Sequence, residues 1–341
     1  MKIIYSSKHI LHATENITLD GQPFIVEELP ARAEIILAAL QRTSLGPVAS
    51  PEDHGLEAVL AVHDADFVTY LRNAYVENAA WLGYEEAVIP GTFAVGRRDT
   101  PPPVSIAGKR GFYAFGIGSP ILAGTWEAAY WSAQCALTAS DAVLASEHSA
   151  YALCRPPGHH AARDLYGGFC YLNNAAIAAR YLQQRTQNRV AILDVDFHHG
   201  NGTQAIFYED PAVFYGSLHA DPRYEYPFYW GFAEERGAGA GLGTNLNIPL
   251  PKGTTDSIYL TALDRALEAL GAFTPEVLIL SLGLDIAEGD EVGGMEITPM
   301  GFRAIGKRIA ALNLPTVIIQ EGGYRLDMLG ANAVAILEAF V

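Results

Sequence analysis

The sequence is poor in cysteine, in positive charge and in long apolar runs. Three of its 341 residues are cysteine, Cys135, Cys154 and Cys170, and none of them forms a CxxC motif. An odd number with this spacing disfavours both a disulfide framework and a cysteine metal site, and it suits the reducing cytoplasm. No apolar run is long enough to cross a bilayer, and the N-terminal MKIIYSSKHIL lacks the apolar core of a signal peptide. We therefore expect a cytoplasmic protein without a membrane partner.

Positive charge is scarce, because 22 Lys and Arg face 38 Asp and Glu, which gives a net charge of −16. This surplus repels phosphate backbones, so we expect no nucleic-acid partner. Half of the residues are hydrophobic (50%), enough for one large core. No long polar linker and no internal repeat divides the chain. We therefore predict a single domain over residues 1–341.

The stretch 190–203, VAILDVDFHHGNGT, carries the clearest functional signal. It begins as an unbroken apolar run, which is typical of a strand buried on both faces of a parallel sheet. Side chains alternate along an extended backbone, so Asp194, Asp196 and, if the extension continues, His198 lie on one side. The carboxyl ends of such strands face the ligand crevice. Carboxylate and imidazole donors at this place suit a divalent metal, with Zn²⁺ among the best candidates.

Strands alternate with helices along the chain, which predicts one parallel α/β sheet. We expect strands at 2–5, 149–153, 213–218, 277–282 and 316–320 and another that starts at 190, and helices at 31–40, 64–75, 124–146 and 173–184. Between 83 and 120, prolines and glycines interrupt every regular pattern. We expect an irregular insertion there, of the kind that serves a site or an interface.

Four predicted strand ends carry a His-His pair, the Asp-x-Asp-x-His set, a lone Asp and a Gly-Gly-Tyr. This inventory is sufficient for metal-assisted amide hydrolysis. A catalytic zinc takes three protein ligands and leaves one position open for water. Our candidate ligands are Asp196, His198 and Asp285.

The remaining residues of this set supply proton transfer and carbonyl polarisation. His159 and His160 can take a proton from water and return one to the leaving amine. The hydroxyl of Tyr324 can hydrogen-bond the oxyanion. His199 would point the other way, and we interpret it as structural.

Six ordered motifs match one family. They are RPPGHH at 155–160, GGFCYLNNAAIAA at 167–179, LDVDFHHGNGTQ at 193–204, SLH at 217–219, SLGLD at 281–285 and EGGY at 321–324. Together they resemble the zinc-dependent histone deacetylase family, and most of all its bacterial, class II-like members related to acetylpolyamine amidohydrolases. The resemblance extends over nearly the whole chain.

The resemblance implies an arginase-deacetylase fold with an eight-stranded, mostly parallel sheet. It implies the same three zinc ligands, which would also accept Fe²⁺, and the same His-His pair and tyrosine. Asp194 would support His159, and Asn201 would support His160. The acyl tunnel would be formed by Gly168, Phe169 and Tyr226.

The resemblance further implies bound monovalent cations and a homodimer. A K⁺ ion would be held by Asp194, Ser217, Leu218 and the backbone oxygens of Asp196 and His198, and a second site would use Phe207, Asp210 and Val213. In the related enzymes, the segment that corresponds to 83–120 closes over the site through a dimer partner.

Two departures from the polyamine enzymes concern the substrate. Glutamates that attract the distal ammonium groups in those enzymes align here with Ala107 and Gly118. The segment 288–295, EGDEVGGM, replaces an aromatic stretch. Other acidic residues are available to replace these glutamates, namely Glu85, Glu86, Asp290 and Glu291, but the sequence places none of them at the rim.

The substrate is therefore an acetylpolyamine-like amine, an acetyl-lysine or a small aliphatic amide. Two alternatives use the same scaffold without this chemistry. One is a binuclear ureohydrolase of the arginase type, which needs further carboxylates that 281–284 does not supply. The other is a non-catalytic acyl-binding protein.

Overall fold

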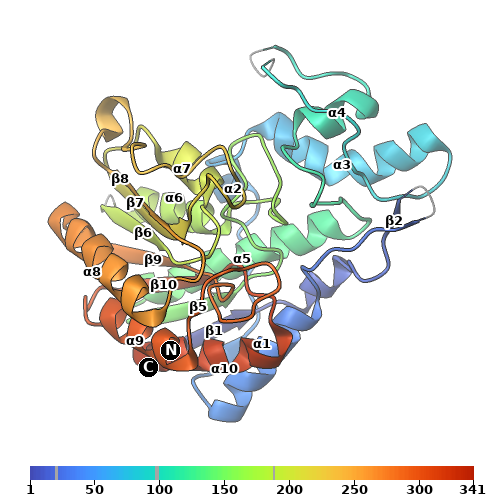
Figure 1. The fold of residues 1–341 in the computed structure, drawn as a ribbon. Coiled ribbons are helices and arrows are strands. Elements are labelled where there is room, and N and C mark those ends of the chain that lie inside the picture. The colour runs from blue at the N-terminus through green and yellow to red at the C-terminus, as the bar shows by residue number, and fades with distance from the viewer. Residues whose placement is uncertain (20–21, 97–99, 187–188) are drawn as a thin grey trace.

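The computed structural model describes residues 1–19, 22–96, 100–186 and 189–341. Its centre is an eight-stranded sheet in the order β4-β1-β5-β10-β9-β6-β7-β8, in which every pair is parallel (Figure 1). The strands are β1 (Lys2–Tyr5), β4 (Val48–Ala49), β5 (Ser149–Leu153), β6 (Val190–Asp194), β7 (Val213–Ala220), β8 (Asn245–Leu250), β9 (Val277–Leu282) and β10 (Thr316–Gln320). The predicted single parallel sheet is confirmed.

Helices cover both faces of this sheet (Figure 1). On one face lie α1 (Ala31–Thr43), α8 (Asp256–Phe273), α9 (Pro299–Ala310) and α10 (Leu326–Leu337). On the other lie α2 (Glu57–Leu60), α5 (Thr125–Leu144), α6 (Asn174–Thr186) and α7 (Asn201–Phe207). Short elements complete the described chain: η1 (Ser7–Leu11), η2 (Gly239–Gly241), η3 (Glu338–Phe340) and the pair β2 (Thr18–Leu19) and β3 (Gln22–Pro23), which is antiparallel.

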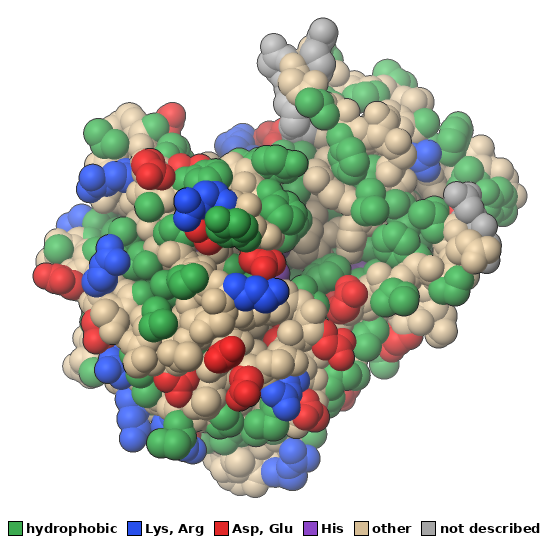
Figure 2. Space-filling model, in the orientation of Figure 1, with side chains coloured by type: hydrophobic (Ala, Val, Ile, Leu, Met, Phe, Trp, Pro, Cys, Tyr) green, Lys and Arg blue, Asp and Glu red, His purple; other side chains and the backbone are tan. Residues whose placement is uncertain are grey.

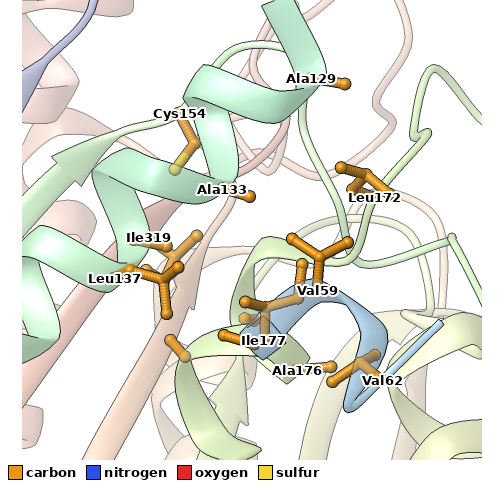
Figure 3. Close-up of a cluster of buried hydrophobic side chains, with 14 of the residues drawn as sticks. Val59, Val62, Ala129, Ala133, Leu137, Cys154, Leu172, Ala176, Ile177 and Ile319 are labelled. Atoms are coloured by element: carbon orange, nitrogen blue, oxygen red, sulfur yellow. The ribbon is translucent and has the colours of Figure 1, made fainter. Parts of the chain in front are cut away.

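The two-sided burial explains the apolar runs in the sequence. In β6, Val190 and Ile192 pack into one hydrophobic cluster, whereas Ala191 and Leu193 pack into the other. Figure 3 shows part of the first cluster, where Ile177 of α6 and Leu137 of α5 lie near Ile319 of β10. Successive side chains of a strand point to opposite faces, so a strand between two helical layers needs apolar residues throughout.

A lobe beside the sheet is built from α3 (Ala65–Leu82), α4 (Ile106–Phe112) and the chain around them (Figure 1). The prediction that 83–120 is wholly irregular is therefore wrong, because α4 lies within it. Ser105 has extended backbone angles at the helix start, and Gly111 allows close packing, since a Cβ there would lie 1.8 Å from the carbonyl oxygen of Thr92. Within the described residues, no helix is long and apolar enough to cross a membrane.

Candidate active site

Four neighbouring strands place the candidate residues together. β5, β10, β9 and β6 are adjacent in the sheet and run in the same direction. Their carboxyl ends therefore meet at one edge, where α/β sheets bind ligands. The loops after these strands carry His159 and His160, Tyr324, Asp285, and the pair Asp196 and His198.

The three predicted metal ligands face one another. The Nδ1 atom of His198 lies 3.3 Å from Oδ1 of Asp196 and 3.0 Å from Oδ2 of Asp285. The expected extension beyond Asp194 does not occur, because β6 ends there. Instead, Oδ1 of Asp196 accepts the backbone N–H of His198 at 2.9 Å, and this aspartate turn brings the two side chains together.

The donor set fits a tetrahedral zinc ion. Donors bound to one zinc at about 2.1 Å lie about 3.4 Å apart, close to the spacing found here. Both carboxylates are fully buried. Burial and then the negative charge of Asp196 raise the pKa of Asp285 to about 7. A divalent cation would relieve this repulsion, because buried carboxylates are stable when paired with a cation or metal.

Two glycines make room for these carboxylates. A Cβ at Gly283 would lie 2.3 Å from Oδ2 of Asp196, and a Cβ at Gly322 would lie 2.4 Å from Oδ2 of Asp285. The N–H of Gly322 also donates to Oδ2 of Asp196 at 2.8 Å. The glycines of SLGLD and EGGY are therefore required by the close approach of the ligands.

The two histidines have different supporting partners. Nδ1 of His159 donates to Oδ2 of Asp194 at 3.1 Å, and Nδ1 of His160 donates to Oδ1 of Asn201 at 2.7 Å. Burial lowers the pKa of His159, but the carboxylates of Asp196 and Asp194 outweigh burial and raise that pKa to about 10. Burial and the charges of His159 and His198 hold the pKa of His160 well below its usual value. Without a metal, the pKa of His159 is therefore raised while that of His160 is lowered.

Tyr324 lies at the same centre, 7% exposed, with its ring 5.7 Å from that of Phe169. Burial raises the pKa of its phenol well above the usual value, so the hydroxyl stays protonated and can donate. Arg32 stacks over the ring at 4.6 Å and donates to the carbonyl oxygens of Glu321 (2.7 Å) and Gly323 (2.5 Å).

Several of the candidate residues line a cavity of about 310 Å³, here called the channel. Its lining residues include His159, His160, His198, Tyr324 and the three residues predicted for the acyl tunnel, Gly168, Phe169 and Tyr226. The rest of the lining is largely apolar. This shape suits a short acyl group held over a polar floor.

A second, wider groove of about 840 Å³ shares Tyr324 with the channel, and we call it the acidic groove. Its exposed acidic residues are Glu15, Glu27, Glu288, Glu291 and Asp327. Figure 2 shows a hollow between the sheet and the α3–α4 lobe, with red acidic side chains along one side of it. The positions aligned with the glutamates of the polyamine enzymes are less acidic: Gly118 lines the channel, and Ala107 lies in α4.

Two sets of residues were predicted to bind monovalent cations, and the first includes residues of the neighbouring strands β6 and β7. Asp194 and Ser217 are partners across β6 and β7, and the Ser217 hydroxyl lies 2.8 Å from Nδ1 of His219. In the second set, the N–H of Asp210 donates to the carbonyl of Phe207 at 3.0 Å, and the N–H of Val213 donates to the carbonyl of Asp210 at 3.5 Å.

A buried charge network behind the site was not predicted from the sequence. Glu28 is fully buried, and its Oε1 accepts from Nη1 of Arg32 at 2.5 Å and from Nε of Arg155 at 2.9 Å. The one signal for it was Arg32 itself, a charged residue on the packing face of a predicted helix. Its carbonyl partners are 289 and 291 residues away, which no local pattern reveals.

This sheet, with paired histidines, a tyrosine and an Asp-His-Asp set at its strand ends, defines the arginase-deacetylase class of fold. Residues 26–340 match the histone deacetylase domain. The chain is 43% identical to acetylpolyamine amidohydrolase 1 of Pseudomonas aeruginosa, covering 100% of this chain and 99% of that protein. It is 41% identical to the acetylpolyamine amidohydrolase of Mycoplana ramosa, covering 99% of each.

A solved structure agrees with these sequence comparisons. The crystal structure of acetylpolyamine aminohydrolase from Burkholderia pseudomallei superposes with a TM-score of 0.93 at 40% identity, covering 100% of this chain and 98% of that one. The chain belongs to the histone deacetylase family. The family and fold implied by the motifs are confirmed.

Proposed function

We propose that this protein is a zinc-dependent amidohydrolase that removes an acetyl group from a cationic acylated amine of the acetylpolyamine type. The observation that carries the proposal is the meeting of Asp196, His198 and Asp285 beside two histidines and Tyr324 in one channel. The names of the relatives from Pseudomonas aeruginosa and Mycoplana ramosa support the polyamine as substrate.

The three ligands would hold the zinc at the floor of the channel. A bound zinc supplies Lewis acidity, which lowers the pKa of water to about 7 and polarises an amide carbonyl. Fe²⁺ would fit the same oxygen and nitrogen donors.

His160 is the proposed proton acceptor. It is neutral at neutral pH, and its Nδ1–H is committed to Asn201, so Nε2 keeps its lone pair for the attacking water. Asp194 stabilises the cationic form of His159, which would carry a proton and donate it to the departing amine. The supporting partners thus give two adjacent histidines opposite tasks.

Tyr324 would donate its hydroxyl proton to the carbonyl oxygen as negative charge develops there. Phe169 and Tyr226 would enclose the acyl chain, with Gly168 leaving space beside His160. K⁺ at the Asp194–Ser217 site would stabilise the loop of metal ligands from below, and the site at Phe207, Asp210 and Val213 is our second proposed monovalent site.

A cationic leaving group is favoured by the acidic groove beside Tyr324. The glutamates of this groove would attract a distal ammonium group. They would take over the role of the glutamates of the related enzymes, which are replaced here by Ala107 and Gly118. The net charge of −16 acts in the same direction over longer distances. Acetyl-lysine peptides and small neutral amides are the competing substrates.

We further propose a homodimer in the cytoplasm. An apolar surface of exposed aromatic and aliphatic residues adjoins the channel through Tyr226, and includes Phe93, Val95, Phe228 and Tyr229. A second copy of the chain would cover this surface, because monomeric proteins rarely expose large contiguous apolar patches. A light-scattering series that shows monomer at every concentration would refute the dimer.

The substrate proposal is tested by kcat/KM of the zinc-loaded protein on acetylputrescine, acetylspermidine and an acetyl-lysine peptide, measured as acetate released. We expect the two polyamines to be preferred. A preference for the peptide would keep the deacetylase chemistry but refute the polyamine. No acetate from any of the three would refute the amidohydrolase.

A further inference from the structure

Asp290 belongs neither to the metal ligands nor to the acidic groove. It comes five positions after Asp285 in the chain and is 8% exposed, whereas its neighbours Glu288 and Glu291 are not buried. Asp290 therefore differs from Glu288 and Glu291, its neighbours in the sequence, which line the acidic groove.

The Asp290 carboxylate binds four backbone N–H groups from two segments. Oδ1 accepts from Val292 at 3.0 Å and from Gly293 at 3.2 Å. Oδ2 accepts from Tyr324 at 2.7 Å and from Arg325 at 2.9 Å. A carboxylate offers about four lone-pair sites, so Asp290 has none left for a substrate ammonium.

Both segments contribute to the catalytic channel, which Val292 and Tyr324 line. One carboxylate thus ties a wall of the channel to the backbone of the carbonyl-polarising residue. We propose that Asp290 is a positioning residue, which fixes the Tyr324 hydroxyl relative to the channel wall. This inference rests on the deacetylase function proposed above.

The opposite side of the Tyr324 loop is held independently. Arg32 binds the carbonyl oxygens of Glu321 and Gly323, while Asp290 binds the N–H groups of the next two residues. Arg325 adds a third connection by donating to the carbonyl of Glu288. The loop is therefore clamped by its carbonyls from α1 and by its N–H groups from the 286–293 loop, which leaves the phenol little freedom.

The test is Asp290→Asn, which keeps the side-chain shape but replaces one acceptor oxygen by an NH₂ that cannot accept. We expect kcat on the preferred substrate to fall about 10- to 100-fold, the cost typical of small misplacements. KM should stay within about threefold. The Asp290 carboxylate binds backbone N–H groups, but its charge also raises the pKa of Asp285, so bound zinc is measured in the same variant and should stay at the wild-type level.

A matched control is Asp256→Asn. This carboxylate also accepts a backbone N–H, that of Thr298 at 2.9 Å, and a hydroxyl at 2.7 Å, but it does not line the channel. We expect its kcat to equal that of the wild type. An equal loss in both variants would mean that the effect is general destabilisation, and would overturn the inference.

The double variant Asp290→Asn with Tyr324→Phe decides whether Asp290 acts through Tyr324. Residues that act as one unit are non-additive, so Asp290→Asn should cost less than about twofold when Tyr324→Phe is already present. The full loss in both backgrounds, or a wild-type kcat for Asp290→Asn, would refute the inference. If the Asp290→Asn variant does not fold, Asp290→Glu replaces it in the same experiments. This variant shifts the carboxylate by one methylene and is judged by the same criteria. A wild-type protein without activity would instead refute the proposed function.

Discussion

The floor of the channel, where the proposed metal ligands lie, differs in burial from its rim, where the acidic groove begins. At the floor, Asp194, Asp196 and Asp285 are fully buried, and their oxygens are engaged by neighbouring donors. At the rim, Glu288 and Glu291 of the acidic groove are exposed. Burial demands a partner for each polar atom, so each floor residue depends on several others. Exposed residues at the rim need no such partners, because water can bind their polar atoms.

This difference separates chemistry from substrate choice. A change at the floor disturbs a coupled set of ligands, histidines and backbone amides, so its effect on catalysis should be large for every substrate. A change at the rim alters attraction to one part of one substrate, so its effect should be small and selective. Three sets of variants test this separation, from the largest expected effect to the smallest.

Asp285→Ala removes one of three ligands and leaves Asp196 and His198. We expect kcat/KM to fall at least about 10³-fold on acetylputrescine and on the acetyl-lysine peptide alike, because several kcal/mol of Lewis acid catalysis are lost and each 1.36 kcal/mol is tenfold. Acetate release and bound zinc are measured together. Retained turnover with loss of zinc would mean that the floor does not act through a metal.

Tyr324→Phe removes one hydroxyl and leaves the ring against Phe169 and Arg32. We expect kcat to fall about 10²- to 10³-fold, as for the loss of one oxyanion donor, with one zinc per chain still bound. Steady-state kinetics with metal analysis checks this. Unchanged turnover would refute the role given to the hydroxyl.

Glu288→Gln with Glu291→Gln neutralises two rim charges in the acidic groove. We expect a loss in kcat/KM of about three- to tenfold on acetylspermidine, carried by KM and reduced by added salt, because exposed charges are screened. The neutral substrate acetyl-butylamine should be unaffected. Glu85→Gln with Glu86→Gln is the matched control, since neither residue lines the groove or the channel. Equal losses on charged and neutral substrates would remove the distinction between rim and floor.

The sequence predicted the floor well for a physical reason. Strands buried on both faces must be apolar throughout, so β5, β9 and β10 match the predicted bounds to the residue, and β6 begins at the predicted Val190. Each of these strands is followed within two positions by a charged residue or a glycine, and parallel topology brings the four ends together. The residues proposed as metal ligands, both histidines and Tyr324 were therefore identifiable, and the structure brings them together at the ends of these strands.

The features that were missed depend on distant partners. In β8, asparagines alternate with apolar residues. The buried side-chain amides of Asn245 and Asn247 donate to Oε1 of Gln204, which is more than 40 residues away. The role of Asp290 was missed because its partners at Tyr324 and Arg325 are 34 and 35 residues distant. Local patterns report periodicity and turn chemistry, but not which buried polar groups will meet.

The most direct test of the account is a zinc titration of metal-free protein, with acetate release from acetylputrescine measured at each step. The Asp-His-Asp set predicts that activity rises linearly and stops at one zinc per chain. A break at two metals per chain would indicate a binuclear centre of the arginase type. Activity that does not depend on added metal would contradict the central claim, that the floor of this channel is a mononuclear metal site.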